Sequence, residues 1–347
     1  MSKHPTGPLY GLLAAVLFGA STPFAKMLLA HCGPVLLAGL LYLGSGLGLG
    51  AWYLLAGQRE RQASLVRRDL PWLGAAILCG GVVAPVLLMV GLRAMDASAG
   101  SLLLNLEGVF TALLAWFLFR ENFDRRIFLG MAAILGGAVL LAWPTAQMHW
   151  SLAALPIAGA CLAWALDNNL TRRVSGSDPV QIAGLKGLTA GVVNITIALS
   201  LGERWPSMGV VGSALLLGLL SYGVSLTCFV LALRFLGTAR TGAYFSTAPF
   251  VGAALSLVFF REAPTAMFWI AGSLMALGVW LHLSENHEHT HTHEPLEHDH
   301  EHIHDEHHQH THTSADPPGE PHSHTHVHAR LTHRHPHYPD LHHQHEH

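Results

Sequence analysis

Residues 110–121 read FTALLAWFLFRE, and residues 251–262 read VGAALSLVFFRE. The two stretches lie 141 residues apart, and each ends in Phe-Arg-Glu after a long apolar run. An apolar run that stops at charged residues is typical of a helix that leaves a lipid bilayer. The repetition at a constant spacing predicts two copies of one membrane unit.

The composition supports a membrane protein. The chain has 347 residues, of which 51% are hydrophobic and only 12% are charged. A helix needs about 20 mostly apolar residues to cross a bilayer. We therefore expect an all-α integral membrane protein with ten transmembrane helices, at residues 8–30, 34–56, 71–92, 97–119, 126–143, 150–170, 180–202, 208–234, 239–260 and 264–284.

The two copies are expected to be inverted relative to each other. At the same offset of 141 residues, Leu92-Arg93 matches Leu233-Arg234 and Gly137 matches Gly278. Each copy holds five spans, an odd number, so the second copy enters the membrane in the opposite sense. Inverted repeats recur in secondary transporters, where the cargo site lies near the midplane between them. We expect one five-helix repeat at 8–143, a second at 150–284, and a separate tail at 285–347.

Segments 92–143 and 233–281 resemble the end of an EamA repeat, from the drug/metabolite transporter superfamily. The resemblance covers about residues 8–284. It implies ten helices in two inverted halves, no required cofactor, and export or exchange of small solutes such as amino acids, other metabolites or drugs. The sequence departs from the family at two places. The family often has Glu-Pro in the fourth helix, where this chain has Glu107-Gly108, and it often has arginine in the second helix, where this chain has Leu41.

Loop charges predict the orientation. With the N-terminus in the cytoplasm, the inner segments carry 12 Lys and Arg residues and the outer segments carry three. Basic residues favour the cytoplasmic side. We expect a multi-pass protein of the cell membrane with both termini in the cytoplasm.

Glu107 and Lys26 are candidate transport residues. Glu107 lies near the middle of the fourth span, where a charge costs roughly 2.5–3.5 kcal/mol on insertion scales. It is a candidate proton, cation or cargo site; the alternatives are a structural partner of a nearby base and a protonated acid that faces another helix. Lys26 lies toward the end of the first span and reaches either an interior anion or the lipid headgroups.

The sixth and seventh spans supply a second group of candidates. Asp167 and Lys186 lie at similar depth, so we expect an ion pair that either gates the inner mouth or neutralises two charges in a packed bundle. Further candidates to line a cavity are polar or aromatic, with packing as the alternative role of each: Asn168, Asn105, Trp164 and Tyr222.

The tail is rich in histidine. Residues 285–347 hold 23 of the 27 histidines, 12 acidic residues and two arginines, with almost no apolar content. Such a composition predicts disorder, and neutral imidazoles predict binding of zinc, nickel or cobalt. A solvated tail with incidental metal affinity and a pH-responsive brush are the alternatives. The candidate metal ligands are His287, His289, His291, His293, His298, His300, His302, His304, His307, His308, His310, His312, His322, His324, His326 and His328.

Three functions follow from these observations. We favour a carrier of small solutes with a metal-binding cytoplasmic tail. The alternatives are an exporter of divalent metal ions and a membrane metal sensor without transport. No catalytic motif is present, so we expect no enzyme. The expected partners are lipid, a small-molecule solute and divalent metal ions but not nucleic acid, and a homodimer is left open.

Overall fold

The structure is a computed structural model. It describes residues 6–55, 65, 67–119, 125–143, 152–172, 174, 177–229, 231–232, 241, 244–283, 288–293, 296–302, 322–328 and 331–336. The chain divides into two compact units, Met1–Glu285 and Asn286–His347.

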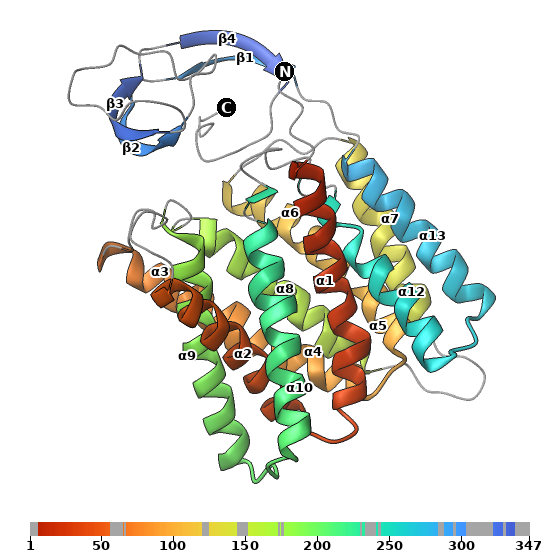
Figure 1. The fold of residues 1–347 in the computed structure, drawn as a ribbon. Coiled ribbons are helices and arrows are strands. Elements are labelled where there is room, and N and C mark those ends of the chain that lie inside the picture. The colour runs from red at the N-terminus through yellow and green to blue at the C-terminus, as the bar shows by residue number, and fades with distance from the viewer. Residues whose placement is uncertain are drawn as a thin grey trace. The chain divides into compact units, whose positions relative to one another are not determined.

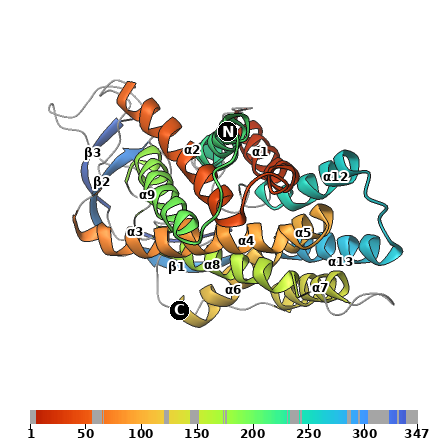
Figure 2. The ribbon, with the colours of Figure 1, turned by 90° about the horizontal axis from the view of Figure 1, so that it is seen from below.

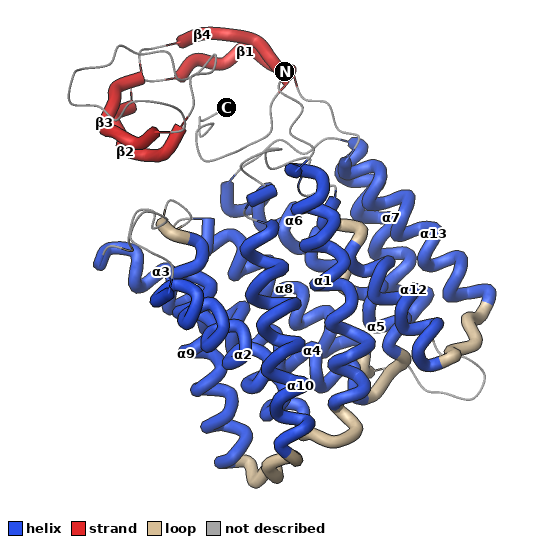
Figure 3. The backbone as a smooth tube through the Cα atoms, in the orientation of Figure 1, coloured by secondary structure: helices blue, strands red, loops and turns tan. Residues whose placement is uncertain are grey.

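The first unit is a bundle of helices (Figures 1 and 3). Its α-helices are α1 (Thr6–Leu28), α2 (Pro34–Leu55), α3 (Leu70–Ala76), α4 (Ala84–Arg93), α5 (Ala97–Leu103), α6 (Leu106–Phe119), α7 (Arg125–Ala142), α8 (Ala154–Arg172), α9 (Pro179–Ser200), α10 (Met208–Gly218), α12 (Ala248–Phe260) and α13 (Ala266–Leu283). A 3-10 turn, η2 (Arg67–Asp69), precedes α3, and two π-helical turns are η3 (Ile77–Val83) and η4 (Leu219–Val224).

Seven helical stretches of the described chain are long and apolar enough to cross a membrane. They are Gly7–Leu28, Pro34–Leu55, Arg67–Arg93, Ala97–Leu114, Arg125–Ala142, Pro179–Ser200 and Met208–Phe229. The shorter apolar helices Ala248–Phe260 and Ala266–Leu281 lie in the expected ninth and tenth spans, and α8 lies in the sixth. The protein is therefore a helical membrane protein, while the count of ten spans and the inversion of the repeats stay predictions.

The surface of the bundle fits lipid better than water. Large apolar side chains are exposed on it, among them Leu55, which is 86% exposed, and Met208 and Val258, each 72% exposed. In water, such exposure over many helices would favour aggregation. Hydrocarbon removes this cost and requires only that each helix satisfies its own backbone hydrogen bonds.

Close backbone contact joins α2 to α9 and α10, and Figure 2 shows α2 and α9 side by side. A Cβ atom on Gly187 of α9 would lie 2.5 Å from the backbone nitrogen of Gly46 in α2. A Cβ atom on Gly218 of α10 would likewise overlap the carbonyl of Leu41 in α2. Small residues at such crossings let membrane helices associate by van der Waals packing. The glycines here therefore join the first repeat to the second.

Two π-helical turns interrupt long helices at matching places. The turn η3 lies between α3 and α4, and η4 follows α10 at a position about 142 residues later. A π turn is rare and frequently marks a functional site. Gly81 of η3 lies against Ala190 of α9, and Gly223 of η4 lies near Ser45 of α2. The two turns therefore face the α2–α9 pair from corresponding positions.

The second unit contains four strands, β1 (Glu288–His293), β2 (Leu296–His302), β3 (His322–His328) and β4 (Leu331–Pro336). β1 pairs with β4 and β2 with β3, both antiparallel. This differs from the disordered tail that the composition predicts. The His-X-His alternation has the two-residue period of a strand, whereas a low apolar content says nothing about period. A lone two-stranded ribbon is only marginally stable in water.

The close contacts of the glycines predict that adding one methyl group lowers the thermal stability of the protein. Gly218→Ala places a Cβ against the backbone of α2 and should lower the thermal midpoint of the purified protein in detergent, because overpacking costs about 1–3 kcal/mol. Gly212→Ala, in the same helix, is the control because no atom lies within 4 Å of its Cβ position. Equal midpoints for the two variants would contradict the close packing of α10 on α2.

Candidate functional site

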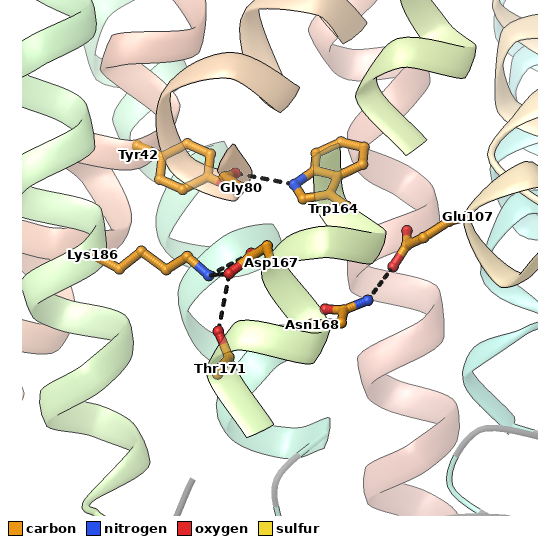
Figure 4. A network of polar contacts seen from close by, with 8 residues as sticks. All are labelled: Tyr42, Gly80, Glu107, Trp164, Asp167, Asn168, Thr171 and Lys186. Carbon is orange, nitrogen blue, oxygen red and sulfur yellow. Dashed lines mark hydrogen bonds and ion pairs between the residues drawn. The ribbon is translucent and has the colours of Figure 1, made fainter. Parts of the chain in front are cut away.

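The backbone carbonyl of Gly80 in η3 accepts hydrogen bonds from two side chains. The hydroxyl of Tyr42, from α2, donates to this carbonyl at 2.5 Å, and Nε1 of Trp164, from α8, donates to it at 3.1 Å (Figure 4). The next carbonyl, of Gly81, accepts from Nδ2 of Asn194 in α9 at 3.1 Å. Side chains from both repeats therefore converge on one π-helical turn.

The glycine at position 80 is required by a neighbouring carboxylate. A Cβ atom there would overlap Oδ2 of Asp167. The absence of a side chain lets Asp167 of α8 lie directly against η3. A π turn also shifts the hydrogen-bond register of a helix, which accommodates the two side-chain donors at the Gly80 carbonyl.

Asp167 and Lys186 form the expected ion pair. Nζ of Lys186 lies 2.5 Å from both carboxylate oxygens, and Oγ1 of Thr171 donates to Oδ1 at 2.9 Å (Figure 4). The two side chains are 7% and 11% exposed. Because buried charges are costly unless they are paired and hydrogen-bonded, this arrangement neutralises both groups within the bundle.

Glu107 has a different environment. It lies in the first turn of α6, and its Oε1 accepts a hydrogen bond of 2.8 Å from Nδ2 of Asn168 in α8 (Figure 4). Glu107 is partly exposed and Asn168 is exposed. Among the residues that the structure describes, no basic side chain forms an ion pair with Glu107. Of the alternatives for Glu107, a nearby base is not found among the described residues, where its partner is the amide of Asn168.

Aromatic rings lie beside these carboxylates. Phe18 of α1 contacts Trp164, Tyr222 and Phe245, with ring centroids 6.3, 5.9 and 5.3 Å away. Tyr42 contacts Tyr222 at 5.3 Å. We call these five residues the aromatic cluster. Trp164 and Tyr222 were predicted to line the site, whereas Phe18, Tyr42 and Phe245 carry no signal that separates them from ordinary packing residues in an apolar helix.

Lys26 contacts the end of a helix and not the polar groups around η3. Its Nζ donates to the carbonyls of Leu92 at 2.6 Å, Met95 at 3.0 Å and Arg93 at 3.4 Å, at the C-terminal end of α4. These carbonyls are the hydrogen-bond partners that the structure gives Lys26, and the two expected roles, an interior anion partner and a headgroup contact, stay predictions. The unpaired carbonyls of a helix end attract a cation, and the end of α4 lies within reach of α1.

Asn105 has a structural role. It lies between α5 and α6, and its Nδ2 donates to the carbonyl of Leu102 at 2.9 Å while contacting the sulfur of Met275. The side chain is buried and bonds to its own helix end. Of the two roles expected for Asn105, packing is therefore the one that the structure favours.

Two further acids act at helix starts. Glu203 accepts from the backbone nitrogens of Leu36 at 2.8 Å and Val35 at 3.3 Å, at the start of α2. Glu262 accepts from Ala97 at 3.0 Å and Ser98 at 3.2 Å, at the start of α5. Carboxylates stabilise the free N–H groups and positive dipole end of a helix. Each acid belongs to the second repeat and each helix start belongs to the first.

A sequence motif marks one of these two acids, Glu262. Glu262 belongs to the repeated Phe-Arg-Glu motif, and Arg261 before it adopts a left-handed conformation with φ of 50° that ends α12. That conformation costs a non-glycine residue about 1 kcal/mol or more, so the turn toward α5 is held by tertiary contacts. Glu203 had no distinguishing sequence signal.

The structure gives no side-chain geometry for the predicted metal ligands. Among the described residues, no group of three or more His, Cys, Asp or Glu side chains is placed to hold an ion. Ten of the candidate histidines lie in β1, β2 and β3, where only the backbone is described. The remaining six lie outside the described residues: His287, His304, His307, His308, His310 and His312.

The sequence of this helical bundle matches a transporter family. The EamA-like transporter family matches this chain twice, over residues 5–143 and 151–284. The chain belongs to the EamA-like transporter family. The two matches meet in the short segment between α7 and α8, so this EamA protein carries two copies of the family's unit.

Individual relatives agree with the family. An uncharacterized transporter of Methanothermobacter thermautotrophicus is 30% identical over 288 residues, which is 78% of this chain and 84% of the relative. A probable 4-amino-4-deoxy-L-arabinose-phosphoundecaprenol flippase subunit, ArnE, of Pseudomonas fluorescens is 40% identical over 70 residues, or 20% of this chain and 60% of that subunit. A protein of known crystal structure, 20% identical, shares the fold with a TM-score of 0.58 over 80% of this chain and 98% of its own.

The ion pair predicts non-additive stability effects. Asp167→Asn or Lys186→Met alone leaves one buried charge without its partner and should cost about 3–5 kcal/mol of unfolding free energy. The double variant should cost clearly less than the sum of the two. Thermal and denaturant unfolding in detergent measures all three, and strict additivity would show that the pair does not interact.

The helix contact of Glu203 predicts a smaller loss. Glu203→Gln removes a charge from two backbone hydrogen bonds and should lower the unfolding free energy by about 1–2 kcal/mol. Arg204→Gln changes the adjacent, exposed side chain and serves as the control. An unchanged thermal midpoint for Glu203→Gln would mean that the carboxylate does not hold the start of α2.

Proposed function

We propose that this EamA protein is a secondary transporter that exports a small organic solute, such as an amino acid, another metabolite or a drug. The observation that carries the proposal is a layer of polar side chains inside a bundle of membrane-spanning helices. Glu107 and the Asp167–Lys186 pair belong to this layer. Ionisable groups at membrane depth are costly and commonly mark a transport path.

The path is proposed to run between the two repeats. The α2–α9 contact joins them, and donors from α2, α8 and α9 meet at η3. In transporters built from inverted repeats, the two halves rock about a site near the midplane. Ten spans, inverted repeats and cytoplasmic termini are parts of this proposal.

The tail is proposed to bind divalent metal ions in the cytoplasm. The register of β2 and β3 sets His298 opposite His326 and His300 opposite His324. Imidazoles on paired strands suit the three or four nitrogen ligands that zinc takes, and 23 histidines would hold roughly five to seven ions. In this proposal, the metal regulates the carrier and is not its cargo.

Flux measurements test the carrier and the tail together. The full chain and a variant ending at residue 284 are reconstituted into liposomes and offered amino acids, polyamines, drugs, a lipid-linked amino sugar, zinc, nickel and cobalt. The lipid-linked sugar is included because the ArnE relatives are flippase subunits. We expect an organic solute to cross with both proteins, and several zinc ions to bind the full chain alone.

The outcomes separate the alternatives. Metal flux through both proteins, without flux of an organic solute, would show a metal exporter. No flux of any compound, together with zinc binding by the full chain, would favour a sensor that does not transport. Equal zinc binding by both proteins would contradict the assignment of metal binding to the tail.

A further inference from the structure

The polar layer carries an excess of negative charge. Lys186 forms an ion pair with Asp167, since its ammonium lies 2.5 Å from both carboxylate oxygens. The two charges cancel at short range. Glu107 adds a second carboxylate, and its hydrogen-bond partner Asn168 is neutral. Among the described side chains that form this layer, the formal charge is therefore −1 when Glu107 is ionised.

This extra carboxylate keeps one oxygen without a hydrogen bond among the described residues. Glu107 is partly exposed and Asn168 is exposed, whereas Asp167 is buried. The amide of Asn168 occupies one oxygen of Glu107, and the structure gives Oε2 no partner among the described residues. Because Glu107 shares no partner with the Asp167–Lys186 pair, a donor that binds its second oxygen leaves that pair intact.

The aromatic cluster is linked to the same carboxylate through α8, which carries both Trp164 and Asn168. Trp164 and Asn168 are four residues apart on α8, so they share one face about one turn, or ~6 Å, apart. Figure 4 shows Trp164 directed toward Gly80, and Glu107 held by Asn168 from the next turn of the same helix. Phe18 joins Trp164 to Tyr222 and Phe245. Ring faces attract cations, and the attraction is stronger where water is excluded.

The charges of the polar layer disfavour an anionic or a neutral solute and favour a cation. An anion would approach a carboxylate of the same sign, while the nearby ammonium of Lys186 is already paired. A neutral solute would leave an ionised Glu107 without a counter-charge. A cation would supply the counter-ion that the described side chains do not provide, and its apolar part would lie against aromatic rings.

We propose that the transported solute is an organic cation, an amine whose ammonium group binds Glu107 and whose flat apolar part packs against Phe18, Trp164 and Tyr222. This inference rests on the proposed transport function and narrows the solute class. Glu107 provides the charge preference, and the aromatic cluster provides the preference for a flat body.

Three indole compounds that differ mainly in charge provide the test. Tryptamine is a cation, tryptophan is a zwitterion and indole-3-propionate is an anion at neutral pH. Uptake of each into liposomes containing the full chain is measured, and binding is measured in detergent by calorimetry. Tryptamine should be bound and carried at least about tenfold better than indole-3-propionate, since a charged hydrogen bond and ion pair are lost with the anion.

Substitutions test which residues provide the preference for a flat cation. Glu107→Gln should weaken tryptamine binding about tenfold or more and remove the difference between tryptamine and indole-3-propionate, and Glu107→Asp should restore part of it. Phe18→Leu removes a ring that donates no hydrogen bond and should weaken tryptamine binding several-fold. Glu203→Gln, at the start of α2, removes a different carboxylate and should keep the charge preference. Thermal unfolding confirms that each variant is folded.

The failures of the two proposals are distinct. Transport of indole-3-propionate in preference to tryptamine would overturn the cation assignment and leave the carrier function intact. Transport of other solutes without any tryptamine binding would also overturn it. If no solute crosses with the full chain, the transport function itself fails. A charge preference that survives Glu107→Gln would show that another residue provides it.

Discussion

The contact between α2 and α9 is the interaction on which the rest of the structure depends. Gly46 and Gly187 bring the two backbones together, and no hydrophobic effect drives helices together within lipid, so this close packing has to supply the attraction. Tyr42 and Asn194 then reach η3 from opposite repeats. Moving the helices apart by one side chain would separate the donors that meet at that turn.

Charged residues in the bundle serve two different purposes. Glu203, Glu262 and Lys26 hold helix ends, where free backbone N–H or carbonyl groups need partners that lipid does not offer. Asp167 and Lys186 neutralise each other in the bundle interior. Glu107 belongs to neither group, because its described partner is an amide. That difference in pairing distinguishes Glu107 from the structural charges.

Prediction from the sequence succeeded where the signal was a repeated pattern. The apolar runs and the 141-residue spacing predicted helical spans and the transporter family, and similar depth predicted the Asp167–Lys186 pair. The carbonyl partners of Lys26 were not predicted, because the position of a lysine in a span does not reveal which helix ends beside it. The role of Gly80 was also missed, since a glycine in an apolar run has many uses and only its contact with Asp167 identifies this one.

The sequence by itself determined that the chain enters a membrane, that its unit occurs twice and that a histidine-rich segment follows. These properties depend on composition and period, which the order of residues contains directly. Only the tertiary structure decided which groups meet. Glu107 lies 61 positions from Asn168 and Glu203 lies 167 positions from Leu36. Such pairs depend on how helices cross, and crossing is set by close packing of side chains from several helices at once.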